Sequence, residues 1–165
     1  MPKGQNGIHT IFPIFKDDGF EVYCDFETDN GNWTVFQRRI NGQTDFYRGW
    51  NAYENGFGNL KAVFWLGNRK ISELTSTGKH ELRIDLTDFD GNTRFGNIQR
   101  STLEMGRPIT NSQLMDIVGI LCGYVNLNGR YLQGGQIDTK GINWYNWKTS
   151  WYSMKSSVMM FRKVH

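Results

Sequence analysis

Residues 20–26 read Phe-Glu-Val-Tyr-Cys-Asp-Phe, and residues 33–39 read Trp-Thr-Val-Phe-Gln-Arg-Arg. In the first stretch apolar and polar side chains alternate, which is typical of a strand with one buried face. The turn-forming cluster 28–32 separates the two stretches, and the Asn-Gly pair at 41–42 tolerates the positive φ of a tight turn. We therefore predict strands over 20–26 and 33–40, with turns after each of them.

Further along the chain the spacing of apolar residues changes to three or four, which favours helix. Aromatic side chains recur at that spacing over 44–55, where Thr44 can cap the start of a helix and Gly56 can end it. A second helix is predicted over 68–77, with Gly78 as its stop.

The remaining strands follow from clean alternation. Residues 79–88 predict a strand, Asp90-Gly91-Asn92 a turn, 93–105 the hairpin partner and 152–163 a last strand. Strands and short helices are interspersed without a regular βαβ rhythm, so the predicted fold class is α+β. No linker, repeat or low-complexity stretch divides the 165 residues, and the sequence predicts a single domain.

Composition excludes several classes of protein. The 19 Lys and Arg against 16 Asp and Glu leave a net charge of +3 with no basic cluster, so no nucleic-acid partner is predicted. The longest apolar runs, 62–66 and 117–122, are far shorter than the ~20 residues of a membrane span. Aromatic residues make up 15% of the chain beside 19 Gly, which favours a compact, loop-rich domain with much β structure.

No catalytic constellation emerges from the sequence, and we predict that the protein is not an enzyme. His80-Glu81 lacks the second His of a zinc-protease helix, and no Gly-x-Ser-x-Gly elbow is present. If Asp88 and Asp90 belonged to an EF-hand loop, Leu86 and Asn97 would stand where carboxylates are needed. These carboxylates are instead predicted to cap a hairpin turn, and no metal site is expected.

The closing part of the chain is rich in large rings that offer weak candidates for ligand binding. Flat rings with a polar tip can stack on sugars, and they can equally fill a core, so both interpretations stay open. The candidates are Trp144, Trp147, Trp151 and Tyr152.

Seven motifs, in order along nearly the whole chain, resemble one known family. They are 21–39, 45–60, 64–68, 81–93, 126–132, 141–144 and 151–153. On these motifs the chain resembles the fibrinogen C-terminal domain family, which includes ficolins, invertebrate fibrinogen-related lectins, angiopoietins, tenascins and the fibrinogen chains. The resemblance implies a secreted, non-enzymatic recognition module with a mixed, mainly antiparallel sheet and short helices, most similar to the invertebrate lectin branch.

The chain departs from the family pattern in its last subdomain. Between Ile117 and Cys122 the family normally carries several dozen further residues, with an Asp-rich calcium loop and the partner of Cys122. We therefore expect a truncated domain over 1–165, with its N-terminal and central part over about 8–119 and a remnant of the ligand-binding subdomain and closing strand over about 120–165. The resemblance then implies that the calcium site is absent and that no cofactor is bound.

Both cysteines, Cys24 and Cys122, lack the partners that the family pattern implies. A disulfide between them needs Cα atoms within about 7 Å, and the resemblance places them in different regions, so free or intermolecular thiols are expected. The acetyl-sugar pocket of lectin-like members is altered as well. Gly123 stands in place of a His, Asp138-Thr139 in place of a Tyr-Ala pair and Ser150 in place of an aromatic residue, so acetyl-sugar binding is not transferred.

The leading hypothesis is an extracellular, secreted recognition module that binds glycans or protein partners in a lectin-like or innate-immune role, impaired by the deletion. Its signal peptide is expected outside the given chain. Alternatives are an adhesion or signalling ligand that binds a protein receptor, or a shortened isoform without ligand. Oligomers are expected through a missing upstream region or an exposed apolar surface. That surface would comprise Leu114, Ile117, Val118, Ile120 and Leu121.

Overall fold

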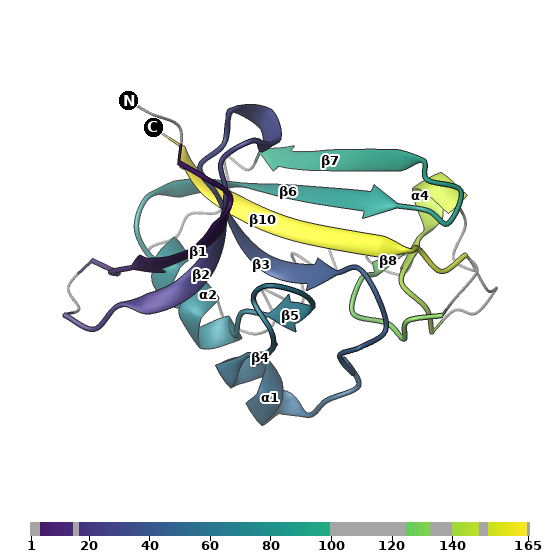
Figure 1. The fold of residues 1–165 in the computed structure, drawn as a ribbon, viewed down its shortest axis with the longest axis horizontal. Helices are drawn as coiled ribbons and strands as arrows, with labels where there is room; N and C mark the ends of the chain where they lie inside the picture. The colour runs from purple at the N-terminus through teal and green to yellow at the C-terminus, as the bar shows by residue number, and fades with distance from the viewer. Residues whose placement is uncertain (1–3, 15–16, 100–124, 133–139, 149–151, 165) are drawn as a thin grey trace.

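The computed structural model describes residues 4–14, 17–99, 125–132, 140–148 and 152–164. Its main feature is an eight-stranded sheet in which β1, β2, β3, β10, β6 and β7 follow one another, while β5 pairs with β3 and β4 (Figure 1). Every pairing between these strands is antiparallel, as the α+β prediction implied.

The long strands lie close to their predicted positions. The bounds are β1 Gly7–Ile11, β2 Phe20–Asp25, β3 Trp33–Arg39, β6 Lys79–Thr87, β7 Thr93–Gln99 and β10 Ser156–Val164. In β6 buried and half-buried side chains alternate along the strand, with Leu82, Ile84 and Leu86 on the core face. The predicted strands 20–26, 33–40 and 79–88 are therefore confirmed, β10 begins four residues later than the predicted strand 152–163, and β1 was not predicted. The part of 93–105 after Gln99 lies outside the described residues.

The last strand completes the sheet from its centre. β10 pairs with β6 from Ser156 opposite Thr87 to Val164 opposite Lys79, and its other edge pairs with β3. Because β10 closes the gap between β3 and β6, the two halves of the sheet become continuous only when the end of the chain is in place. Its methionines Met159 and Met160 and the neighbouring Phe161 are buried in the core.

Between β3 and β6 the chain forms two short helices and the two short strands of the main sheet (Figure 1). They are α1 Trp50–Asn55, β4 Phe57–Gly58, β5 Phe64–Trp65 and α2 Asn68–Thr75. The helix predicted over 68–77 is confirmed. The helix predicted from Thr44 was too long, because α1 begins only at Trp50.

Local hydrogen bonds explain why residues 44–49 do not form a helix. The Thr44 hydroxyl donates to the Val63 carbonyl at 3.2 Å instead of capping a helix, and the Asp45 carboxylate accepts from the Tyr47 backbone N–H at 2.8 Å. Such side-chain bonds offer the backbone an alternative to helix. Gly56, with φ at 91°, ends α1 as predicted.

A small second sheet lies at the end of the main sheet where β10 begins (Figure 1). It pairs β8 Val125–Asn126 with β9 Asn143–Trp144, and the short α4 Tyr145–Lys148 follows directly. None of the described helices is long and apolar enough to cross a membrane.

The core is dominated by rings that meet edge to face. Trp65, 3% exposed, lies within 5.8 Å of Phe36 and 5.4 Å of Tyr53 between ring centroids, and its indole N–H donates to the Tyr53 carbonyl and the Asn68 side chain, both at 3.0 Å. Trp33, 1% exposed, donates to the Thr28 carbonyl at 2.8 Å. Buried indoles with paired N–H groups gain apolar burial without leaving a donor unsatisfied.

Candidate functional site

The described residues form a groove between the loop that follows β3 and the segment that follows β8. The groove consists of two hollows of about 400 Å³ and 410 Å³, which have Phe46, Tyr47 and Arg130 as common lining. Its remaining lining residues are Arg39, Gly42, Thr44, Asp45, Asn126, Asn128, Gly129, Tyr131, Leu132 and Lys140. We call this the 47/130 groove.

The first wall is the loop over 42–47, and the core holds it in place. Phe46 is 4% exposed and meets Phe57 edge to face at 4.9 Å, while its carbonyl accepts from the Tyr53 hydroxyl at 2.9 Å. Burial raises the pKa of Tyr53 to about 12, so this hydroxyl stays a donor at neutral pH. The neighbouring Tyr47 ring is 84% exposed and stands at the rim of the groove.

The second wall is the segment 126–132, which buried polar side chains of β3 fasten to the sheet. The Gln37 amide donates to the Leu127 carbonyl at 2.9 Å, and the Ser157 hydroxyl of β10 donates to the other end of the same amide at 3.0 Å. The Arg39 guanidinium donates to the carbonyls of Leu127, at 3.3 Å, and of Gly129. These buried hydrogen bonds fix the wall relative to β3 and β10 before any ligand arrives.

Two backbone segments approach each other closely at the base of this second wall. The Arg130 backbone N–H donates to the Lys140 carbonyl at 2.7 Å, and Arg130 and Gly141 form a bridge. A Cβ at Gly129 would collide with the backbone of Lys140 and Gly141, so a glycine is needed at this position. The sequence Asn-Gly-Arg at 128–130 therefore places a cation directly after a tight backbone contact.

Arg39 is a buried cation without a carboxylate partner. It is 1% exposed, and in the described part of the chain no Asp or Glu forms an ion pair with it. Burial lowers the pKa of Arg39 to about 10, which Tyr53, Tyr131 and Asp45 partly oppose, so the guanidinium remains charged at neutral pH. Its Nε–H is buried and has no hydrogen-bond partner, although Nη1 has two.

Arg130 supplies a second cation at the groove, this one exposed. Its Cζ lies 6.0 Å from the centroid of the Tyr47 ring, and no ion pair joins it to a described carboxylate. Lys140 lines one of the two hollows with Arg130, and Asp45 is the single carboxylate among the lining residues that the structure describes. The groove is therefore electropositive and suits an anionic group.

The lining of the groove has the chemistry of a binding surface. Its described residues include no Cys, Ser or His, and the described part of the chain has no cluster of three or more His, Cys, Asp or Glu side chains that could hold a metal ion. What remains is a preformed surface of cations, amides and rings, which can bind and orient a partner.

The four aromatic candidates from the sequence lie elsewhere or outside the described residues. Trp147 and Tyr152 are half-buried and pack against the core, and the Tyr152 hydroxyl accepts from the Phe89 N–H at 3.0 Å. The backbone of Trp144 lies in β9, and Trp151 falls outside the described residues. The two rings whose side chains are described do not line the 47/130 groove, and ligand binding by this set stays a prediction.

Of the carboxylates that were predicted to cap a turn, Asp88 does so, whereas Asp90 is exposed and its carboxylate lies 3.6 Å from the Lys148 ammonium. Asp88, which is fully buried, accepts from the Asn92 backbone N–H at 2.8 Å and from its side-chain amide at 2.9 Å, and Lys148 lies 3.0 Å away. Burial alone would raise the pKa of Asp88, but these contacts lower it to about 2. Lys148 thereby ties α4 to the β6–β7 hairpin.

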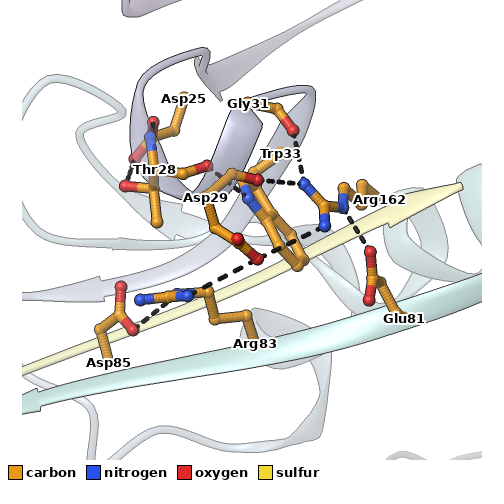
Figure 2. Close-up of polar contacts among 9 residues, drawn as sticks. All are labelled: Asp25, Thr28, Asp29, Gly31, Trp33, Glu81, Arg83, Asp85 and Arg162. Atoms are coloured by element: carbon orange, nitrogen blue, oxygen red, sulfur yellow. Dashed lines mark hydrogen bonds and ion pairs between the residues drawn. The ribbon is translucent and has the colours of Figure 1, made fainter. Parts of the chain in front are cut away.

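A second polar cluster pairs each of its two arginines with carboxylates, as Figure 2 shows. Arg162 contacts Glu81 and Asp29, and Arg83 contacts Asp85 and, at 3.8 Å, Asp29. Arg162 also donates to the carbonyls of Asp29 at 2.5 Å and Gly31 at 3.1 Å. Both cations have carboxylate partners, so this cluster fastens the 28–31 turn to the sheet rather than presenting free charge.

Of the two cysteines, Cys24 is buried in β2 and free. Burial raises the pKa of its thiol, which disfavours the reactive thiolate. Cys122 and the apolar residues 114–121 lie outside the described residues.

Sequence reasoning missed the residues of the 47/130 groove, although one signal pointed to them. In a strand, residues two apart share a face, so Gln37 and Arg39 of β3 point the same way, opposite Met159 and Ser157 of β10. Burying a charged side chain costs free energy unless it is hydrogen-bonded, so a charged residue on the buried face of a strand indicates a role other than apolar packing. Nothing in the sequence showed that Tyr47 and Arg130 would lie beside it.

A family model for the C-terminal globular domain of the fibrinogen beta and gamma chains matches residues 2–107 and 119–164. The chain belongs to this family. Fibrinogen C domain-containing protein 1 of Macaca fascicularis is 36% identical and that of Homo sapiens 35%, each over 204 aligned residues that cover 96% of this chain. The chain spans 47% and 44% of the length of these relatives, respectively. Because the alignments are longer than the 165-residue chain, the relatives have residues in this region that it lacks.

Solved structures agree with the family assignment. The fibrinogen-like globe domain of human ANGPTL2 superposes with a TM-score of 0.78 at 25% identity, covering 96% of this chain and 93% of that chain. A lamprey fibrin D-dimer in complex with the peptide Gly-His-Arg-Pro-amide gives a TM-score of 0.76 at 26% identity, covering 97% and 70%. Domains of this family are typically extracellular, non-enzymatic binding modules.

Proposed function

We propose that this chain is a secreted recognition domain that binds a protein partner through the 47/130 groove. One observation carries the proposal. The walls of the groove are fixed by buried hydrogen bonds from Gln37 and Arg39, whereas Arg39 and Arg130, which line it, form no ion pair with a carboxylate among the described residues. A rigid surface with unneutralised charge loses little entropy on binding and gains complementarity.

A lectin-like role is the second candidate, in which the partner is a glycan and the setting innate immune recognition. The exposed Tyr47 ring beside the amides of Asn126 and Asn128 favours it, since sugars stack on rings and exchange hydrogen bonds with amides. The aromatic set Trp144, Trp147, Trp151 and Tyr152 would provide an alternative surface for the same role.

Three features of the proposal concern the longer protein to which such domains belong. The deletion inferred from the resemblance removes the calcium loop, so binding is proposed to be calcium-independent. Self-association would bring several grooves together and raise avidity through multivalency. In an adhesion or signalling role the same groove of this chain would bind a protein receptor, whereas in a shortened isoform without ligand the groove would bind nothing.

The experiment is a parallel screen of the biotinylated chain on an array of secreted and cell-surface ectodomains and on a glycan array. The chain is compared with Arg130→Gln and with the matched control Arg94→Gln, which removes an exposed arginine on β7 outside the groove. We expect a protein signal that Arg130→Gln removes and Arg94→Gln retains. Signals confined to glycans would support the lectin candidate, and binding that ignores both substitutions would refute the groove.

A further inference from the structure

The charge balance of the groove decides which chemical group it can take. Among the described residues, two guanidiniums line the same hollow, from Arg39 and Arg130, and one carboxylate, that of Asp45, does so. Asp45 already accepts from the Tyr47 backbone N–H at 2.8 Å. An incoming anion would therefore meet an excess of positive charge rather than displace an existing ion pair.

The buried guanidinium also has an unused donor. Arg39 is 1% exposed, and its Nη1 donates to two backbone carbonyls, while its Nε–H has no hydrogen-bond partner. A buried donor without an acceptor costs about 1–3 kcal/mol, and native proteins rarely keep one without a reason. Arg39 lines the hollow, which places this arginine beside the space that an acceptor would enter.

The rings of the groove are mostly engaged already, which argues against a sugar-stacking platform. The Phe46 ring contacts Phe57, and the Arg39 guanidinium lies 4.2 Å from its centroid. The half-buried Tyr131 ring contacts Phe89, with 6.4 Å between the ring centroids. Tyr47 is the most exposed ring of the set and has Arg130 beside it. The cations are thus the groups left for recognition, and the rings orient them.

We propose that the 47/130 groove binds an acidic peptide segment of the partner protein, with an Asp or Glu carboxylate held by Arg39 and Arg130. The proposal rests on the proposed function and names its ligand. Guanidinium and carboxylate have matching planar geometry, and such hydrogen bonds are about twice as strong as neutral ones. The second hollow, lined by Asn126, Asn128 and Lys140, would then receive the polar flank of the segment.

Isothermal titration calorimetry on the full chain tests this with three probes. They are N-acetyl hexaglutamate amide, the isosteric N-acetyl hexaglutamine amide, and hexagalacturonate as an acidic glycan. We expect the glutamate peptide to bind at least about tenfold more tightly than the glutamine peptide, and less tightly as salt is raised. The acidic glycan should bind more weakly than the glutamate peptide.

Substitutions assign the binding to the groove. Arg130→Gln should weaken binding of the glutamate peptide at least about fivefold, as expected for loss of one charge-assisted contact, whereas Arg94→Gln should leave it unchanged. Arg39→Lys keeps the positive charge but removes the planar pair of guanidinium donors, and it should weaken binding of the glutamate peptide as well. If that variant fails to fold, as circular dichroism would show, the affinities of Arg130→Gln and Tyr47→Ala for the glutamate peptide still show whether it binds in the 47/130 groove.

Equal affinity for the two peptides, tighter binding of the glycan, or equal losses in Arg130→Gln and Arg94→Gln would each overturn the proposal. These results differ from failure of the proposed function. If the array screen finds a protein partner whose binding Arg130→Gln removes, but the glutamate peptide does not bind, the recognition role survives and the acidic ligand does not. If neither experiment shows dependence on Arg130, both are wrong.

Discussion

Replacing Arg162 by Met should destabilise the domain far more than removing an ordinary surface arginine. Arg162 donates to the carbonyls of Asp29 and Gly31, contacts the Glu81 carboxylate, and lies over the Trp33 ring with Cζ 4.2 Å from the centroid (Figure 2). Its side chain is 20% exposed and that of Glu81 12%, so water screens their interaction only in part. Met keeps an aliphatic stem over the indole but removes every donor.

The magnitude follows from these contacts. Hydrogen bonds that involve a charged group are worth about 1.5–3 kcal/mol each, and the contact with the ring adds about 0.5–1 kcal/mol. The contacts of one guanidinium are not additive, so we expect a total loss of about 2–4 kcal/mol in the free energy of unfolding. At about 3 °C per kcal/mol for a domain of this size, the melting temperature should fall by roughly 6–12 °C.

The matched control is Arg69→Met. Arg69 also forms an ion pair, at 3.1 Å with Glu54, but its side chain is 67% exposed. Exposed pairs contribute about 0–1 kcal/mol, so this variant should melt within a few degrees of the wild type. Differential scanning calorimetry and urea titration measure both variants. Equal losses in the two variants would refute the reasoning that Arg162 fastens the 28–31 turn to the sheet.

Three further predictions concern pH, calcium and thiols. Burial and the nearby Lys163 lower the pKa of His80, although a hydrogen bond with Gly78 opposes them, so the unfolded chain takes up the proton at a higher pH than the folded one. The contribution of His80 to stability should therefore be complete above about pH 6.5 and decrease as the pH drops below it. In thermal scans His80→Phe should lose less stability in acid than the wild type. Calcium chloride should not raise the melting temperature, because the resemblance implies that the family's calcium loop belongs to the stretch missing between Ile117 and Cys122; a rise that depends on calcium concentration would contradict this. In Cys122→Ser the remaining thiol, Cys24, should react with Ellman's reagent at least about tenfold more slowly in the native than in the unfolded chain, and equal rates would show that the thiol is accessible.

The sheet could be predicted from the sequence because its strands carry their own signal. In β6 the alternation of Leu82, Ile84 and Leu86 with charged residues fixes both the strand and its buried face. The strand β10 was predicted as well, but its place between β3 and β6 depends on pairings more than a hundred residues apart in the case of β3. The local pattern of the sequence does not predict such long-range pairings.

The error at residues 44–49 has a tertiary cause. The aromatic spacing around Phe46 and Trp50 satisfies a helical pattern, but Phe46 packs against Phe57 of β4 and the Thr44 hydroxyl bonds to Val63. These contacts with a later segment outweigh a helix propensity that is worth only a fraction of a kcal/mol per residue, up to about 0.7 kcal/mol.

The candidate site was less predictable because it is assembled from distant parts of the chain. Arg39 and Leu127, whose carbonyl it binds, are 88 residues apart. The sequence shows a charged residue on the buried face of a strand, but only the fold shows that its neighbours are carbonyls and a groove. Attention to ring-rich sequence pointed instead to Trp147 and Tyr152, whose described contacts are with the core.

The most direct test of the central claim follows the arginine side chains of the ¹⁵N-labelled chain by nuclear magnetic resonance during titration with N-acetyl hexaglutamate amide. The account predicts that the Nε–H signals of Arg39 and Arg130 shift together and saturate, while those of Arg69 and Arg94 stay in place. Uniform small shifts of all four signals, or an unchanged Arg39 signal at saturation of binding, would contradict it.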